Sequence, residues 1–234
     1  MTDPAEGTPL HAMRVGYADQ PLRESDLADN PQDQFQTWLA HAVAAALPEP
    51  NAMVLATTNG TEPSARTVLL KGVDSRGFTF FTNRGSRKAS DLASVPMASL
   101  VFPWFAMSRQ VIVRGPVVEV PREESAEYFA SRPRGSQLGA WASQQSSVID
   151  GADALEQGYA DVAARWPEPE VVPLPDHWGG FLVMATSVEF WAGRQSRLHD
   201  RLRYLRSGSA PTASAGGALL DDASRWSTVE RLSP

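Results

Sequence analysis

The sequence has no cysteine, which excludes disulfides, thiolate metal ligands and cysteine nucleophiles. Its four histidines are scattered and form no HxH or HExxH spacing, so no metal site is predicted. The chain starts without an apolar leader. It also lacks the roughly 18 to 20 consecutive apolar residues that a membrane span needs. We therefore expect a cytoplasmic protein with no membrane partner.

Other absences narrow the class of ligand. The net charge of −6 disfavours nucleic-acid binding, which depends on neutralising phosphates. No Gly-x-Gly-x-x-Gly or Walker-type loop opens a helix, so neither a Rossmann nor a P-loop nucleotide site is predicted. What the chain does have is 42% hydrophobic residues, including seven Trp and nine Phe, over 234 residues. That composition predicts a globular protein built around one large core.

The hydrophobic pattern predicts a mainly β protein with peripheral helices, in the α+β class. A helix is expected to start after Asn30 as its cap, with Pro31 in the first turn. Its apolar stripe would consist of Phe35, Trp38, Leu39, Val43 and Leu47. Further helices are expected at 86–93, 123–130, 136–142 and 152–166. Strands are expected at 52–58, 65–71, 78–82, 98–104, 110–120, 181–191, 198–206 and about 225–232. The run of five consecutive strands predicts an antiparallel barrel or sheet.

Composition also divides the chain. Residues 1–12 are rich in Pro and Gly and are expected to form a disordered tail, leaving 13–234 as a single domain. Within that domain, residues 207–218 have the Ser, Gly and Ala content of a flexible linker. We expect a flexible loop at about 207–222.

Only two of the 21 basic residues are lysines, Lys71 and Lys88, which makes their positions informative. Lys88 closes the segment 82–88, where a strand leads into a helix with Ser86 as the expected cap. Arg84, Arg87 and Lys88 would there join free backbone N–H groups at the positive end of the helix dipole. This pattern predicts a phosphate site. The alternative is an exposed basic first turn.

A second basic cluster follows at Tyr128, Arg132, Arg134 and Ser136. Tyr128 and Arg132 are four residues apart, which would place them on one helical face, with Ser136 in the turn that follows. The cluster could hold a second phosphate. Alternatively, Glu124 and Glu127 could pair with the arginines at the surface.

The segment 188–201 gathers basic and planar side chains: Trp191, Arg194, Arg197, His199 and Arg201. Arg197, His199 and Arg201 alternate with a period of two, which predicts that they share one face of a strand. Indole, imidazole and guanidinium groups together suit a flat, anionic ligand. The alternative is a solvated, arginine-rich hairpin rim.

Seven motifs occur in the same order as in a known family. They are Arg66-Thr-Val-Leu-Leu-Lys71, Phe81-Thr-Asn-Arg-Gly-Ser-Arg-Lys88, Phe102-Pro-Trp with Arg109-Gln-Val, 128–137, 139–147, Trp178-Gly-Gly-Phe, and Glu189-Phe-Trp with Arg197-Leu-His-Asp-Arg201. On these motifs the chain resembles the FMN-dependent pyridoxamine/pyridoxine 5′-phosphate oxidases, over nearly its whole length. The resemblance implies an FMN-binding split β-barrel that forms a homodimer, with two FMN at the subunit interface.

The resemblance also implies roles for individual residues. FMN would be bound by Arg66, Thr67, Val68, Leu69, Leu70, Lys71, Phe81, Thr82, Arg87, Lys88, Gln110, Gln145, Ser146, Trp191 and Arg201. The substrate would be bound by Arg14, Tyr17, Lys71, Tyr128, Arg132, Ser136, Arg197 and His199. Arg197 and His199 would act in catalysis. The chain departs from the family at Phe81, where a Tyr is common, and the loop at 207–222 looks enlarged.

The implied reaction oxidises pyridoxamine 5′-phosphate or pyridoxine 5′-phosphate to pyridoxal 5′-phosphate, as part of vitamin B6 biosynthesis or salvage. Hydride passes to the flavin, and dioxygen is reduced to hydrogen peroxide. Two alternatives stay open. One is a related flavin oxidase acting on another planar substrate, of the phenazine-pathway type. The other is a non-catalytic protein that binds flavin or a B6 phosphate.

Overall fold

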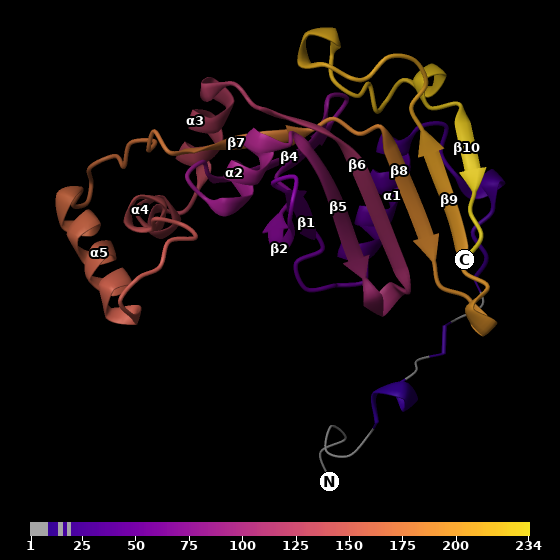
Figure 1. Ribbon diagram of the computed structural model, residues 1–234, viewed down its shortest axis with the longest axis horizontal. Helices are drawn as coiled ribbons and strands as arrows, with labels where there is room; N and C mark the ends of the chain where they lie inside the picture. The colour runs from indigo at the N-terminus through magenta and orange to yellow at the C-terminus, as the bar shows by residue number, and fades with distance from the viewer. Residues whose placement is uncertain (1–8, 14–15, 18–19) are drawn as a thin grey trace.

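Ten antiparallel strands form one curled sheet that branches at its longest strand, β6 (Arg109–Glu119) (Figure 1). The computed structural model describes residues 9–13, 16–17 and 20–234. One path through the sheet runs β10-β9-β8-β6-β5-β1-β2, and the other branch carries β7, β4 and β3. The remaining strands are β1 (Ala52–Thr58), β2 (Pro63–Leu69), β3 (Gly72–Asp74), β4 (Gly77–Asn83), β5 (Met97–Trp104), β7 (Trp178–Val183), β8 (Ser187–Ala192), β9 (Asp200–Leu205) and β10 (Thr228–Arg231). The antiparallel sheet predicted from the sequence is confirmed.

The branch occurs at Gly115. The first half of β6 pairs with β8, whereas Val117–Glu119 pair with β7. A Cβ at Gly115 would lie 2.1 Å from the carbonyl oxygen of Met184, so only glycine permits this close approach. The single strand predicted at 181–191 is therefore wrong: β7 and β8 are separate strands because each pairs with a different half of β6.

Helix α1 (Pro31–Ala44) begins as predicted. The Asn30 side chain accepts a hydrogen bond of 2.9 Å from the backbone N–H of Asp33, and Pro31 occupies the first turn. Of the predicted stripe, Phe35 and Trp38 are buried, but Val43 is 59% exposed. Ala42 takes the core position instead, because the helix turns about 100° per residue and carries Val43 to the solvent side.

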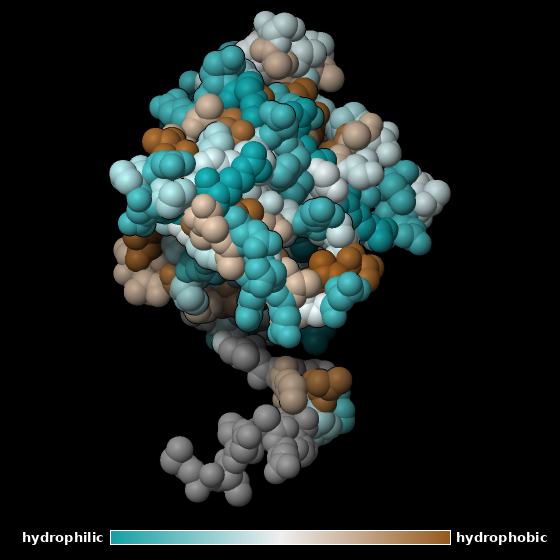
Figure 2. All heavy atoms as spheres, turned by 90° about the vertical axis from the view of Figure 1, so that its left-hand side faces the viewer, coloured by the Kyte–Doolittle hydropathy of each residue, from teal (hydrophilic) through white to brown (hydrophobic). Residues whose placement is uncertain are grey.

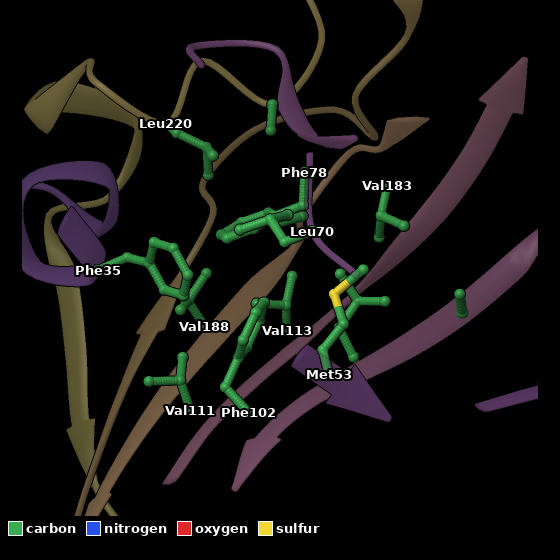
Figure 3. Packing of buried hydrophobic residues seen from close by; sticks show 14 of the residues in the cluster. Phe35, Met53, Leu70, Phe78, Phe102, Val111, Val113, Val183, Val188 and Leu220 are labelled. Atoms are coloured by element: carbon green, nitrogen blue, oxygen red, sulfur yellow. The ribbon is translucent and has the colours of Figure 1, made fainter. Parts of the chain in front are cut away.

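The core lies between α1 and the concave side of the sheet (Figure 3). The ring of Phe35 meets those of Phe78 in β4 and Phe102 in β5 edge-on, with centroids 5.1 and 4.9 Å apart. Burying each such side chain contributes roughly 1.5 to 3 kcal/mol. Leu220 also packs here with no exposed surface, and its N–H donates to the carbonyl of Ser75 over 2.8 Å.

Leu220 lies inside the segment 207–222, which the sequence predicts to be a flexible loop. At least this part of it is anchored in the core. The mobility of the rest of the segment stays a prediction, as does the division into a tail of 1–12 and one domain of 13–234.

Four helices gather at one end of the sheet, on the left of Figure 1. They are α2 (Arg87–Ser94), α3 (Arg122–Ser131), α4 (Arg134–Ala142) and α5 (Ala152–Arg165), each within two residues of its predicted bounds. A second small core of Phe129, Leu138, Val172 and Trp178 packs beneath them. Figure 2 shows that the outer face at this end is mostly hydrophilic. Within the described part of the chain, no helix is long and apolar enough to cross a membrane.

Candidate active site

A cavity of about 940 Å³ lies between the edge strand β2, the start of α2 and the turn that joins α3 to α4. Its wall contains five basic side chains and, among the described residues, no carboxylate. The five are Arg66, Lys71, Arg87, Lys88 and Arg132. The rest of the polar lining consists of hydroxyl and amide groups from Ser64, Thr67, Thr82, Asn83, Tyr128, Ser131, Ser136, Ser143, Gln145 and Ser146. Such a wall suits a ligand that carries more than one negative group.

Lys88 is the one buried member of the five, with 7% of its surface exposed. Its Nζ donates to Gln145 Oε1 over 2.6 Å, to Thr82 Oγ1 over 3.1 Å and to Ser86 Oγ over 3.3 Å. Burial, with a smaller contribution from the charge of Arg66, lowers the pKa of Lys88 to about 8. The neutral acceptors hold the ammonium group without neutralising it, so a bound anion would stabilise its charged form.

The start of α2 differs from the prediction in two respects. The Ser86 side chain does not cap the helix, because its hydroxyl accepts from Lys88 instead. Arg84 does not line the cavity and pairs with Glu119 over 2.5 Å. Arg87 does line it: its backbone N–H donates to Ser146 Oγ over 3.3 Å, while its guanidinium pairs with exposed Glu62. The site on α2 therefore consists of Arg87 and Lys88 without Arg84.

Arg66 reaches the cavity from β2, and contacts to β1 and α2 fix its guanidinium. Its Nη1 donates to Thr57 Oγ1 over 2.7 Å and to the carbonyl of Leu55 over 3.1 Å. Thr57 in turn donates to the buried carboxylate of Asp91 over 2.6 Å, and Asp91 lies 3.8 Å from Arg66 Nη2. Asp91 therefore orients Arg66 while staying outside the cavity.

The second basic cluster lines the same cavity. Lys71, Tyr128, Arg132 and Ser136 all contribute to its wall. The expected common helical face of Tyr128 and Arg132 is wrong in detail, because α3 ends at Ser131 and Arg132 is extended, with φ −73° and ψ 148°. Both side chains still meet at the cavity. The segments 82–88 and 128–136, which are 40 residues apart in the sequence, thus contribute to one site together with Lys71.

Surface pairing does not account for this cluster. Glu124 pairs with Arg76 over 2.9 Å, away from Arg132. Arg134 also leaves the cluster: its Nη1 donates to the carbonyl of Glu170 over 2.6 Å, and it does not line the cavity. Arg132 keeps its charge at the cavity, where burial lowers its pKa.

The third predicted group, from the segment 188–201 together with Gln110, lies away from the cavity within one chain. Gln110 in β6 is registered opposite Trp191 in β8, which is registered opposite Arg201 in β9. None of the three lines the cavity. The Trp191 ring packs against that of His199 with centroids 4.7 Å apart, and Tyr17 covers both at 5.9 and 5.4 Å.

The strand-face alternation predicted for Arg197, His199 and Arg201 is wrong. Strand β9 begins at Asp200, and Arg197 lies in a 3₁₀ turn with a φ of +62°. The short turn intervenes because Ser196 and Arg197 both take positive φ, which ends the extended conformation. Arg197 is exposed, and His199 Nδ1 accepts from the backbone N–H of Arg194 over 3.1 Å. Arg201 donates to Glu189 over 2.7 Å, which raises the pKa of Arg201.

The other predicted FMN and substrate residues divide between the cavity, the core and the undescribed part of the chain. Thr67, Val68, Leu69 and Phe81 line the cavity. Leu70 does not line the cavity, because its side chain is buried in the core. Its backbone N–H donates to the carbonyl of Asn51, and its carbonyl accepts from the Asn51 side chain. Arg14 lies outside the described residues.

Several residues at the site were missed by sequence reasoning, namely Asp91, Trp178 and the cavity-lining Ser64, Asn83, Ser131 and Ser143. Asp91 carries no motif of its own, and its only signal is its position three residues after Lys88 on the same helix. Trp178 lines the cavity and belongs to the Trp-Gly-Gly-Phe motif, which the sequence analysis noted without giving it a role. Asp91 lies behind Arg66, whereas Trp178 is itself part of the cavity wall.

The amino-acid sequence matches a described family in two adjoining parts. Residues 39–165 match the pyridoxamine 5′-phosphate oxidase family, and residues 178–234 match the pyridoxine 5′-phosphate oxidase C-terminal dimerisation region. The chain belongs to the pyridoxamine 5′-phosphate oxidase family. It is therefore an oxidoreductase, with a mainly β fold and a dimerisation region as the resemblance implied.

Relatives in this family align over nearly the whole chain. A pyridoxine/pyridoxamine 5′-phosphate oxidase of Kineococcus radiotolerans is 50% identical over 234 residues, covering 99% of each chain. One of Salinibacter ruber is 50% identical over 227 residues, covering 96% of this chain and 99% of the relative. Among solved structures, PhzG of Burkholderia lata 383, in complex with tetrahydrophenazine-1-carboxylic acid, is 28% identical, with a TM-score of 0.80 over 94% of this chain and 100% of that one.

Proposed function

We propose that the protein is an FMN-dependent oxidase that converts pyridoxamine 5′-phosphate or pyridoxine 5′-phosphate to pyridoxal 5′-phosphate. The observation that carries the proposal is the cavity with five basic side chains and no carboxylate among the described residues. Two phosphates, one from FMN and one from the substrate, would balance its two basic clusters. The relatives at 50% identity support the same reaction.

The donor set at α2 fits the phosphate of FMN. Lys88, Arg66 and Arg87 supply charge, while Thr82, Gln145 and Ser146 supply neutral groups. The lowered pKa of Lys88 indicates an ammonium group that lacks a counter-charge, as expected of a phosphate site. When bound, FMN supplies the hydride acceptor for the substrate's 4′ carbon and the means of passing electrons to dioxygen, giving hydrogen peroxide.

The second cluster fits the phosphate of the substrate. Arg132 can bond two phosphate oxygens through its planar guanidinium, with Lys71, Tyr128 and Ser136 around it. These side chains bind and orient the substrate rather than moving protons. Their position beside the FMN cluster would hold the substrate ring within reach of the flavin.

We further propose a homodimer in which each subunit supplies part of the other's site. Gln110, Trp191 and Arg201 would approach the flavin ring, and Arg197 and His199 would contact the substrate. The matched dimerisation region contains four of these five residues, and they lie away from the cavity within one chain. Arg197 would clamp the 4′ carbon against the flavin, and His199 would tune the protonation of the substrate's ring or phenolic oxygen. Tyr17, and Arg14 before it in the sequence, would close over the substrate.

A flavin oxidase of the phenazine-pathway type is the nearest alternative. The solved structure of PhzG supports it through the fold, but at 28% identity it is more distant than the B6 oxidases. A tetrahydrophenazine carboxylic acid carries no phosphate, whereas this cavity has a second basic cluster that a phosphate would explain. The other alternative, a non-catalytic binding protein, is disfavoured because the chain belongs to an oxidase family. The sequence-based expectation of a cytoplasmic location stays a prediction.

One aerobic experiment tests these alternatives. Purified protein should be yellow, with about one FMN per chain. On adding pyridoxamine 5′-phosphate or pyridoxine 5′-phosphate, it should release hydrogen peroxide and form pyridoxal 5′-phosphate, which is followed by absorbance; the amine should also release ammonia. Binding without peroxide would establish a non-catalytic protein. Turnover of tetrahydrophenazine-1-carboxylic acid in place of both B6 phosphates would favour the phenazine-type oxidase.

A further inference from the structure

Three nearly parallel aromatic rings form part of the cavity wall, and two of its cations lie against them. We call Phe81, Tyr128 and Trp178 the aromatic wall. The centroids of Phe81 and Tyr128 are 4.2 Å apart and those of Phe81 and Trp178 are 5.4 Å apart, with interplanar angles of 21° and 7°. Lys71 Nζ lies 5.8 Å from the centroid of Tyr128, and Arg132 Cζ lies 4.8 Å from that of Trp178. Both predicted substrate-phosphate cations therefore rest on aromatic faces.

Arg132 is held by these faces more than by hydrogen bonds. Its guanidinium also lies 5.6 Å from the ring of Phe129. Its Nη1 is buried and has no hydrogen-bond partner among the described residues. Burial removes part of the hydration of this charge and so lowers the pKa of Arg132. An acidic partner would orient such a group but would also neutralise it, whereas a ring face orients it and leaves its charge and donors available.

Trp178 itself is fixed. Only 5% of its surface is exposed, and its backbone carbonyl accepts from Arg122 Nη1 over 2.7 Å. The backbone N–H of Trp178 donates to the carbonyl of Pro175 over 3.1 Å. Two residues later, a Cβ at Gly180 would lie 2.6 Å from Phe81 Cε1, so glycine leaves the room that the aromatic wall needs. The indole is therefore a rigid support for the guanidinium.

We propose that Trp178 is a positioning residue for the substrate's phosphate, acting through Arg132. Its indole holds the guanidinium at the cavity, desolvated and without an acidic partner, so that the phosphate meets a cation already in place. The inference rests on the proposed function in taking the bound anion to be the phosphate of a B6 compound. It adds a residue for which that function gave no role.

The test compares ligands with and without phosphate. On the FMN-loaded protein, titration calorimetry measures the dissociation constants of pyridoxal 5′-phosphate and of pyridoxal. Trp178→Leu should weaken binding of the phosphate compound by about 2- to 30-fold, the range expected for a lost cation–π contact. Binding of pyridoxal and the content of FMN should not change. Trp178→Phe keeps a ring face and should recover most of the affinity.

A double-mutant cycle separates positioning from general packing. In an Arg132→Ala background, Trp178→Phe and Trp178→Leu should have no further effect on pyridoxal 5′-phosphate, because the residue through which they act is gone. Thermal unfolding of each variant identifies loss of the fold. If Trp178→Leu does not fold, Trp178→Met, which also lacks a ring face, takes its place in the two backgrounds: an equal loss of affinity in both overturns the proposal.

The outcomes also separate this inference from the proposed function. Wild-type protein that binds pyridoxal as tightly as pyridoxal 5′-phosphate would overturn the substrate assignment, and the inference with it. Wild-type protein that prefers the phosphate compound, together with a Trp178→Leu variant that keeps the same preference, would overturn the inference alone.

Discussion

The cavity differs from a second region at β8 and β9, which we call the ring group and which contains Trp191, Arg197, His199 and Arg201. The charged side chains of the two regions have different partners. At the cavity, Lys88 is held only by neutral acceptors and Arg132 has an unpaired buried N–H among the described residues. At the ring group, Arg201 is paired with Glu189, and His199 accepts from a backbone N–H. Burial lowers the pKa of Lys88 and Arg132, whereas the hydrogen bond to Glu189 raises that of Arg201.

The difference indicates what each region lacks. The cavity has unbalanced positive charge in a partly desolvated setting, so it needs an anion. In the ring group Arg201 is neutralised by Glu189 and Arg197 is exposed, and none of the group's side chains lines the cavity. This difference is the reason for the proposal that the ring group completes a site on another subunit. Five experiments can break or sharpen this comparison.

The most direct test of the comparison mixes two weakened variants. Arg132→Ala damages the cavity and Arg197→Ala damages the ring group. If each site combines the cavity of one subunit with the ring group of the other, a mixed dimer has one intact site and one with both changes. After co-expression at equal levels, about a quarter of the sites should be intact and active at low substrate concentration. A mixture no more active than its parents would place both residues in one subunit's site. Light scattering should give about twice the chain mass of 25.4 kDa.

Arg197→Ala by itself should mainly depress turnover. We expect kcat to fall by about 100-fold, because loss of the clamp misplaces the substrate's 4′ carbon relative to the flavin. The protein should stay yellow. Stopped-flow reduction of the bound flavin by pyridoxine 5′-phosphate measures the effect directly, and Arg194→Ala, from the same segment, provides a comparison. Wild-type turnover in Arg197→Ala would remove this residue from the site.

Lys88→Ala should weaken FMN binding by roughly 10- to 150-fold, the range for a charge-assisted hydrogen bond to phosphate. Fluorescence titration of the FMN-free protein measures it. Arg84→Ala is the matched control, because Arg84 is close in sequence but pairs with Glu119 outside the cavity. Equal losses in both variants would show that the α2 cluster acts through overall charge and not through a phosphate contact.

Arg132→Ala should raise KM for pyridoxine 5′-phosphate by about 10-fold while FMN stays bound. The expected reason is loss of a phosphate contact that forms in both the ground state and the transition state, so kcat should change little. Arg165→Ala, an exposed arginine at the end of α5, controls for net charge. Loss of flavin in Arg132→Ala would show that the two clusters were assigned to the wrong phosphates.

The smallest effect concerns pH. Lys88 has a pKa of about 8 in the FMN-free protein, and a bound phosphate would raise it. Binding therefore takes up a proton above pH 8, so affinity for FMN should fall as pH rises, by up to about tenfold between pH 7 and pH 9. Riboflavin, which has no phosphate, should bind with a flat profile, and so should FMN to Lys88→Gln. A flat profile for FMN on wild-type protein would contradict this account.

Local features of the fold were predictable because they depend on neighbouring residues. Asn30 and Pro31 mark the start of α1, and alternating apolar residues mark most strands. The predictions are wrong where the structure depends on contacts between segments, such as the pairing of strands. The continuous apolar run from Phe181 could not reveal that β7 and β8 pair with different halves of β6. Likewise, Ser86 is a residue type that often caps helices, but here its hydroxyl accepts a hydrogen bond from the ammonium group of Lys88.

By itself, the sequence determined the chemistry: two basic clusters, a planar-ring segment, no cysteine, and an ordered set of motifs that identifies the family. Only the tertiary structure decided that Lys88 and Arg132 share one cavity, that Asp91 supports it from behind, and that Trp178 carries a guanidinium on its face. The physical reason is that charge type is a local property, whereas burial and orientation depend on contacts between segments far apart in the chain. The branch of the sheet at β6 and the packing of α2 and α3 against it create those contacts.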